Sequence, residues 1–197
     1  MCTNYIGDKR EYYLRLLEKK LKPERLKHTL RTEQKALYLA RLYGEDLGKT
    51  QTAALLHDIL KNISEQETCK LAKKYNIDDF TVKYGKNLLH GLLASYYIKE
   101  ELNIVDEDVI NAVKNHTAGR ADMSHLEKII YLADMIEDGR DFPGVGKLRE
   151  LSEKNLDEAV FAACRQTMSY LISICAPILG GTAELYNDYA TKEGRNV

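Results

Sequence analysis

Apolar residues recur at helical spacing along almost the whole chain, with charged residues between them. Leu14, Leu17 and Leu21 form one face of a first expected helix, which should end before Pro23. Pro23 suits the opening turn of a second helix, because the N–H that proline lacks has no partner there. That second helix should run toward Gly44, a residue type that favours helix C-caps. The pattern therefore predicts helices that pack through apolar faces.

A third helix is expected from Leu47 to His57, and its end, Ala53–Leu56, is almost entirely apolar, which indicates a buried central position. Further helices are expected at Glu65–Tyr75, Leu88–Leu102, Glu107–Lys114, Ser124–Ile136 and Leu156–Ile174. Ser124 followed by Glu127 forms a capping-box pair. The segment 137–146 has the composition of a turn-rich loop, and we find no alternating strand and no repeat. The sequence predicts an all-α chain with one domain.

Composition and charge narrow the class of protein. The 44% hydrophobic and 30% charged content is that of a globular protein, and a net charge of -1 gives no electrostatic case for nucleic acid or membrane. The longest mostly apolar stretch, Tyr170–Leu179, is too short to span a bilayer, and no signal peptide is recognised. Cys2, Cys69, Cys164 and Cys175 form no CxxC pair, so a structural zinc site is not indicated. We expect a soluble, cytoplasmic protein with reduced thiols.

Histidines and aspartates beside apolar segments indicate a functional site. His57 and Asp58 end the most apolar helix, and Asp134 lies in a second apolar run, where buried charge is costly without a partner. A divalent metal would remove that cost at both places, and imidazole accompanies carboxylate in many metal sites. Neighbours on a helix diverge by roughly 100°, so His57 and Asp58 can face one ion only at a helix end. Segment 62–64 suggests such an end. In the alternative interpretation Asp58 only caps or orients His57.

The order His28, His57–Asp58, Asp134 resembles the H…HD…D signature of the HD superfamily. Longer segments resemble the YqeK-type HD-domain hydrolases, bacterial enzymes that split diadenosine tetraphosphate symmetrically into two ADP. Those segments are RLKHTLRT at Arg25–Thr32, LLHDILK at Leu55–Lys61, LLHGLLASYYIKEELNI at Leu88–Ile104, NHTAGRADMSHLEKIIYLADMIEDGRDFPGV at Asn115–Val145 and APILGGT at Ala176–Thr182. The resemblance extends from about Pro23 to Asn187.

The resemblance implies a single helical HD domain over residues 1–197, with a core at about 23–142 and C-terminal helices at about 145–193 that complete the nucleotide pocket. It implies metal ligation by His28, His57, Asp58 and Asp134. It favours iron, with manganese or another divalent ion as the alternative, and one or two ions. The residues expected to be catalytic are Asp58, Lys61, His90 and His116.

The resemblance also implies where the substrate binds. Arg25, Lys61 and Arg140 match positions that hold nucleotide, and His28, His90, His116 and Asp134 are expected to contact it too. The stretch that should lie against the nucleoside is Pro177, Ile178, Leu179, Gly180, Gly181 and Thr182. There the family usually has a His-Pro or similar polar turn, whereas this chain has Leu179-Gly180-Gly181, so the resemblance does not fix the contacts to base or ribose. Ala118 stands where the family usually has Thr, and His125 matches no motif and is expected at the surface.

The partners implied are a dinucleoside polyphosphate substrate, its ADP product and a second copy of the chain in a homodimer. Three alternatives stay open. The enzyme could act on a deoxynucleotide or guanosine tetraphosphate; the cyclic-dinucleotide branch is disfavoured because no GYP motif follows the HD pair. The chain could be a nucleotide-binding regulator without turnover. A purely structural helical protein would leave the histidines and carboxylates unexplained.

Overall fold

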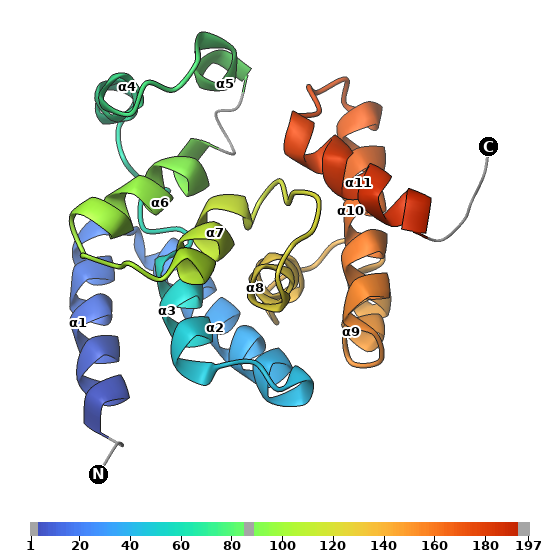
Figure 1. The fold of residues 1–197 in the computed structure, drawn as a ribbon, viewed down its shortest axis with the longest axis horizontal. Coiled ribbons are helices and arrows are strands. Elements are labelled where there is room, and N and C mark those ends of the chain that lie inside the picture. Colours follow the sequence, from blue (N-terminus) through green and yellow to red (C-terminus); the bar gives the residue numbers. More distant parts are fainter. Residues whose placement is uncertain (1–3, 85–88, 193–197) are drawn as a thin grey trace.

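The computed structural model describes residues 4–84 and 89–192, and every regular element in these ranges is a helix (Figure 1). The helices are α1 (Asn4–Lys20), α2 (Pro23–Tyr43), α3 (Leu47–Leu56), α4 (Glu65–Lys74), α5 (Asp79–Tyr84), α6 (Leu89–Glu100), α7 (Glu107–Asn115), α8 (His125–Ile136), α9 (Val145–Ser152), α10 (Leu156–Ser173) and α11 (Gly180–Lys192). The all-α prediction is confirmed.

Helix ends follow the local signals of the sequence. Pro23 opens α2, and Gly44 closes it at φ +72°, with its N–H bonded to the Ala40 carbonyl. The side chains of Ser124 and Glu127 cap the start of α8 reciprocally. These ends were predicted because a few neighbouring residues determine them.

The apolar periodicity did not predict α5, α9 and α11, although the resemblance implied helices at about 145–193. Helix α9 begins at Val145, so the turn-rich loop is shorter than expected, because Val145 and Leu148 are buried by packing. Helix α11 begins at Gly180, a residue type with poor helix propensity. It is held through the buried Leu185 and through Tyr189, whose ring stacks on Phe161. Tertiary contacts thus outweigh local preference in α9 and α11.

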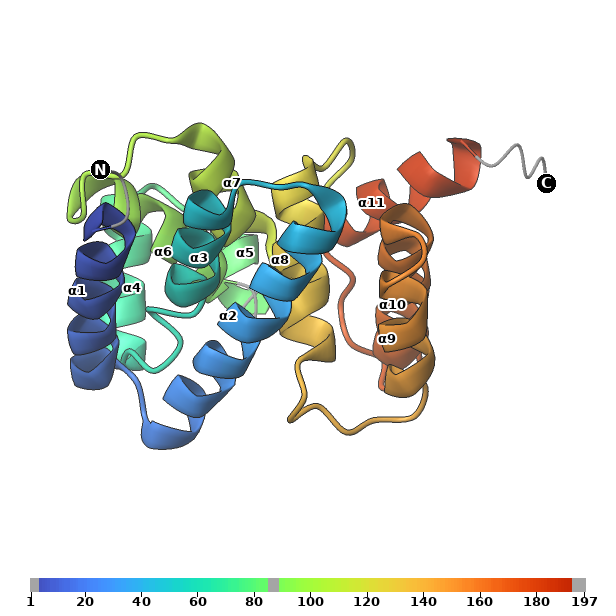
Figure 2. The ribbon, with the colours of Figure 1, turned by 90° about the horizontal axis from the view of Figure 1, so that it is seen from below.

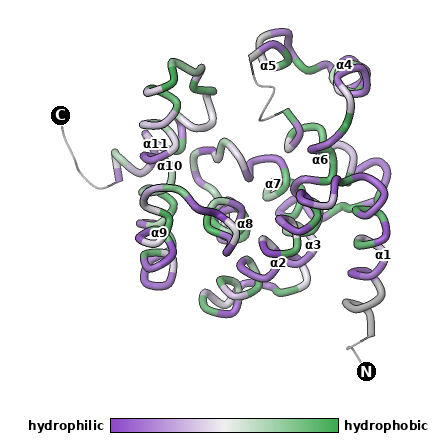
Figure 3. Tube along the Cα trace, turned by 180° about the vertical axis from the view of Figure 1, so that it is seen from behind, coloured by the Kyte–Doolittle hydropathy of each residue, from purple (hydrophilic) through white to green (hydrophobic). Residues whose placement is uncertain are grey.

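The core lies where α2, α3, α6, α7 and α8 meet. Helix α1 lies at one edge, and α9, α10 and α11 form the opposite side of the molecule, against α8 (Figures 1 and 2). Fully buried side chains at the centre include Leu39, Leu56, Leu93 and Ile129. Helices α4 and α5 project from the body near α6, and α4 is largely hydrophilic (Figure 3) and buries only Ala72. Among the described helices, none has the length and apolarity that crossing a membrane needs.

Candidate metal centre

Three helices, α2, α3 and α8, bring the four expected metal ligands together from distant parts of the chain. His28 lies in the first half of α2, and Asp134 lies in the last turn of α8. Helix α3 ends at Leu56, so His57 is its C-cap and Asp58 lies in the following turn. Because the helix stops there, the two neighbouring side chains can face the same point.

The donor atoms of these residues converge. His28 Nε2 lies 2.9 Å from Asp134 Oδ1 and 3.6 Å from Asp58 Oδ2. His57 Nε2 lies 3.4 Å from Asp58 Oδ2 and 3.9 Å from Asp134 Oδ1. We call these four residues the metal-ligand cluster. Asp58 is 2% exposed and His57 is fully buried, so the cluster lies inside the protein.

Two imidazole nitrogens show that the cluster fits a metal ion. In the described part of the chain, His28 Nε2 and His57 Nε2 are buried and make no hydrogen bond. Buried polar atoms are almost always paired, so an unpaired nitrogen beside two carboxylates requires a specific explanation. A divalent cation with nitrogen and oxygen ligands supplies one. The ligand atoms of His28, His57 and Asp58 lie within 4.8 Å of one another.

His90 and His116 extend the cluster on the far side of Asp58. His90 Nε2 lies 2.9 Å from Asp58 Oδ1, and His116 Nε2 lies 3.8 Å from the same oxygen. The two Nε2 atoms are 3.1 Å apart. Asp58, His90 and His116 form a second group with metal-ligand spacing, and so do His57, His116 and Asp134. The spacing of these donor atoms therefore suits either one metal ion or two, the two numbers expected.

The charges of the cluster are those of a cation site. Burial raises the pKa of Asp58 and Asp134, but the neighbouring histidines outweigh it and hold both pKa values well below the usual range. Burial, with the charges of His57 and His90, lowers the pKa of His116 to about 3. Ionised carboxylates and a neutral imidazole are the forms that bind a metal.

Each ligand ring is oriented through its other nitrogen. His57 Nδ1 lies 2.7 Å from the Ala54 carbonyl oxygen, and His116 Nδ1 lies 2.8 Å from the Val113 carbonyl oxygen. Donation by Nδ1–H to these carbonyls leaves Nε2 as the lone-pair nitrogen that faces the centre. In both cases the acceptor is three residues earlier, near the end of the residue's own helix.

Glu137 orients His28 in the same way, and sequence reasoning missed it. Its Oε1 lies 3.2 Å from His28 Nδ1. The carboxylate also accepts from Gly139 N at 2.6 Å and pairs with the guanidinium of Arg31. Although burial raises the pKa of Glu137, these donors, Arg31 foremost, lower it to about 2. A glutamate directly after an apolar helix was the only local signal, because His28 is 109 residues away in the chain.

Of the three basic residues expected to hold nucleotide, Arg25 and Arg140 contact the metal-ligand cluster and Lys61 contacts His90 beside it. Arg25 Nη1 lies 2.9 Å from Asp58 Oδ2, and Arg140 Nη2 lies 2.8 Å from Asp134 Oδ1. Lys61 Nζ lies 3.3 Å from His90 Nδ1, and burial lowers the pKa of Lys61. These cations therefore border the carboxylates on two sides, where phosphate oxygens could bind.

A basic recess of about 380 Å³ opens beside the arginines. Lys22, Arg25, Arg31 and Arg140 contribute its positive charges, and His28 reaches it from the metal-ligand cluster. The whole-chain charge is close to zero, so this local gathering is what could attract an anion. We refer to it below as the basic recess.

The segment 177–182 lies against the loop that follows His116. Thr182 Oγ1 donates a hydrogen bond of 3.1 Å to the Ala118 carbonyl. A Cβ on Gly181 would lie 2.6 Å from the Gly119 carbonyl oxygen, so this contact requires glycine. Within the described residues, the hydrogen bonds of the segment do not include the four metal ligands. It is joined to the cluster through residues 116–119. His125 is exposed, as expected.

Comparison with known proteins agrees with this geometry. The HD domain family matches residues 25–139. The chain is 39% identical over 174 residues to the "Bis(5'-nucleosyl)-tetraphosphatase, symmetrical" of Halalkalibacterium halodurans, covering 88% of this chain and 93% of that protein. It is 33% identical over 178 residues to the Bacillus subtilis protein of the same description, covering 90% and 96%. The crystal structure of a predicted HD superfamily hydrolase involved in NAD metabolism from Clostridium acetobutylicum superposes with a TM-score of 0.88. The two are 34% identical, over 92% of this chain and 97% of that one.

Proposed function

This chain belongs to the HD-domain family, among the symmetrical bis(5'-nucleosyl)-tetraphosphatases, and from that premise we propose that it hydrolyses diadenosine tetraphosphate and related dinucleoside polyphosphates, giving two ADP from the former. The observation that carries the proposal is the buried metal-ligand cluster bordered by Arg25, Lys61 and Arg140. Carboxylates that hold a cation, with guanidinium and ammonium groups beside them, suit a polyphosphate chain.

The metal would be held by His28, His57, Asp58 and Asp134, and a second ion would use Asp58 with His90 and His116. The family resemblance favours iron over manganese. When bound, the metal supplies Lewis acidity, which offsets charge on a phosphoryl oxygen and lowers the pKa of water. Two imidazoles with two carboxylates suit several divalent metals, so metal analysis of the purified protein decides between them.

The chain's own residues position the polyphosphate and offset its charge. Arg25 and Arg140 hold guanidinium groups beside the two carboxylates, where their remaining N–H groups would bind non-bridging oxygens. Lys61 and His90 do the same on the other side of Asp58. Water adds across the central P–O–P bridge, so its oxygen joins one ADP while the other ADP leaves with the bridging oxygen. These positive groups stabilise charge on the phosphoryl oxygens as that bond breaks.

The C-terminal part is proposed to bind one nucleoside. We assign Pro177–Thr182 to this role because the segment packs on the loop after His116 and places backbone close to it. In this division, residues of about 23–142 form the core of the single domain, and helices of about 145–193 complete the nucleotide pocket. A homodimer stays a prediction from the family resemblance, and a cytoplasmic location stays a prediction from the composition. Gel filtration of the metal-loaded protein checks the first.

A substrate panel tests the proposal. We expect turnover of diadenosine tetraphosphate, in the presence of iron or manganese, to exceed that of a deoxynucleoside triphosphate, guanosine tetraphosphate and NAD at equal concentration. NAD belongs in the panel because of the Clostridium acetobutylicum relative's description, and because it also joins two nucleosides through phosphates. Preferred turnover of any other member would contradict the proposed substrate. Binding of ADP without turnover of any member would favour the regulator.

A further inference from the structure

A second recess opens beside the metal-ligand cluster, between the turn after α3 and helices α4, α5 and α6. Its volume is about 340 Å³, and Lys61 and His90 lie at its inner end. The His90 ring lies 2.9 Å from Asp58 and 3.3 Å from the Lys61 ammonium, so the recess adjoins the reaction centre directly. We call it the α4–α6 recess.

We propose that the α4–α6 recess binds the second nucleoside of a dinucleoside tetraphosphate, the one that does not lie against segment 177–182. The inference rests on the proposed function. Symmetric hydrolysis places the central phosphate bridge at the cluster, so two phosphates and one nucleoside must extend from it on each side. The first half is assigned to the side of α10 and α11. Figures 1 and 3 show α4 and α5 at a different edge of the molecule from those helices.

The lining of the α4–α6 recess suits a nucleobase. Leu60, Leu89 and Leu93 are buried apolar residues along it, and Ile63 and Val82 are half-buried beside them. Small-molecule sites are mostly apolar with a few polar groups, and they start at roughly 300 Å³, which this recess exceeds. Flat purine faces bind apolar walls, whereas their edges need hydrogen-bonding groups.

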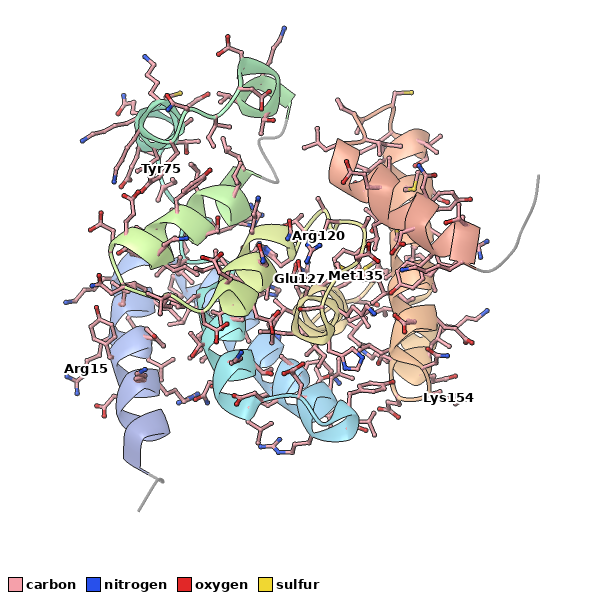
Figure 4. The ribbon with its side chains drawn as sticks, in the orientation of Figure 1. Arg15, Tyr75, Arg120, Glu127, Met135 and Lys154 are labelled. Atoms are coloured by element: carbon pink, nitrogen blue, oxygen red, sulfur yellow. The ribbon has the colours of Figure 1, made fainter. Side chains whose placement is uncertain are left out.

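Polar groups lie at the rim of the recess on α4. Glu65, Thr68 and Cys69 line it from that helix. The rim is attached to the body at the end of α4, where Tyr75 lies beside α6 (Figure 4) and its ring stacks on Tyr96 with centroids 4.4 Å apart. Lys74 adds an ion pair of 2.6 Å with Glu100. Helix α4 is thus positioned over the recess although it buries little of its own surface.

The basic recess is the competing location, and its lining disfavours it. The side chains that line it are charged or polar, and none of them is apolar. Such a surface binds phosphates or ribose hydroxyls, and it offers no apolar wall for a base. We therefore assign phosphates to the basic recess. The base of the second nucleoside is assigned to the α4–α6 recess, which has an apolar wall.

Filling the rim of the α4–α6 recess tests the assignment. Cys69→Trp places a large ring at the recess, and Lys70→Trp places the same ring on the neighbouring exposed residue of α4, which does not line it. We expect Cys69→Trp to lower kcat/KM for diadenosine tetraphosphate about tenfold, because remote substrate contacts contribute to the transition state. The inhibition constant of ADP, which the proposed function assigns to the side of segment 177–182, should stay within about twofold, and Lys70→Trp should resemble the wild type.

Three results would overturn the assignment: unchanged kcat/KM in Cys69→Trp, an equal loss in both variants, or an equal loss of ADP inhibition. Failure of the wild type to hydrolyse the dinucleotide would instead contradict the proposed function.

The natural thiol gives a test that needs neither a variant nor turnover. Cys69 is exposed at the rim, and its alkylation by iodoacetamide can be followed by peptide mass spectrometry on the metal-loaded wild type. A diadenosine tetraphosphate analogue with a methylene group between its second and third phosphates should slow this alkylation at least about fivefold, whereas ADP at a concentration that saturates inhibition should not. Equal alkylation rates with and without saturating analogue would overturn the proposal.

Discussion

Asp58 and Glu127 are both almost completely buried carboxylates, 2% and 1% exposed, yet their surroundings differ in kind. Glu127 accepts hydrogen bonds from Asn115, from the backbone N–H of Ser124 and twice from the Arg120 guanidinium, at 2.6–2.8 Å. Figure 4 shows Glu127 beside Arg120, where the loop after α7 reaches α8. Asp58 pairs with one guanidinium, that of Arg25, but otherwise faces imidazole rings, and one of them, His57, carries a buried Nε2 without a hydrogen bond.

The comparison teaches that burial of charge does not by itself identify a functional site. Glu127 is fully partnered, so it needs nothing from outside the chain, and we interpret it as structural. The cluster around Asp58 has ionised carboxylates beside histidine nitrogens that lack partners, so it is complete only with a bound cation. Substitution of Asp58 should therefore abolish activity, whereas substitution of Glu127 should lower stability.

The largest effect is expected from Asp58→Asn. The change keeps the shape of the side chain but removes a charge that belongs to two of the three candidate metal groups. We expect turnover to fall by about 1,000-fold or more, since removal of such a group eliminates the metal's contribution to the transition state. Metal content, measured by mass spectrometry of the purified protein, should fall with it. A variant that kept full activity would contradict the assignment.

Glu127→Ala should lower the stability of the protein and leave its metal content and turnover unchanged. The change removes the carboxylate partner of Arg120 and the acceptor of the Asn115 amide and the Ser124 N–H, so we expect the free energy of unfolding to fall by about 3 kcal/mol. Denaturant unfolding measures this. Below the unfolding transition, metal content and kcat should stay near those of the wild type. Loss of metal from a folded Glu127→Ala protein would remove the contrast between the two carboxylates.

A smaller effect is expected from Glu137→Gln. The amide weakens the pairing with Arg31 and the hold on the His28 ring, so metal affinity should fall about 10- to 100-fold. Excess metal should restore kcat, which distinguishes positioning from catalysis.

The matched control is Glu33→Gln. Glu33 is 3% exposed and pairs with Arg10 as Glu137 pairs with Arg31, but it lies outside the metal-ligand cluster. Metal titrations of the two variants should therefore differ. Equal affinities would show that Glu137 has no special role at His28.

The smallest effect is expected from Arg140→Lys. The guanidinium donates both to the Asp134 side chain and to its backbone carbonyl, at 2.8 and 2.9 Å, and still presents N–H groups toward the basic recess. Lysine keeps the positive charge but lacks the planar guanidinium, which can donate two hydrogen bonds side by side. We expect an increase in KM of about tenfold with kcat changed less, measured by initial rates. A drop in metal content instead would place Arg140 among the groups that hold Asp134 for the metal.

Which features could be predicted from the sequence depends on how local the contacts are that determine them. His57 and Asp58 could be assigned because an HD pair at the end of an apolar helix is a local pattern, and the helix does end there. Helix α11 and the role of Glu137 could not, because they depend on partners such as Phe161 and His28 in other parts of the chain. The α4–α6 recess likewise joins residues of α4, α5 and α6 that share no local pattern.

The most direct test of the central claim is to identify the products of diadenosine tetraphosphate hydrolysis by the metal-loaded protein, using anion-exchange chromatography. We expect ADP as the sole product, because the proposed binding mode places the central bridge at the metal-ligand cluster with one nucleoside on each side. ATP together with AMP would contradict it, because the cluster would then act on a different phosphate bridge.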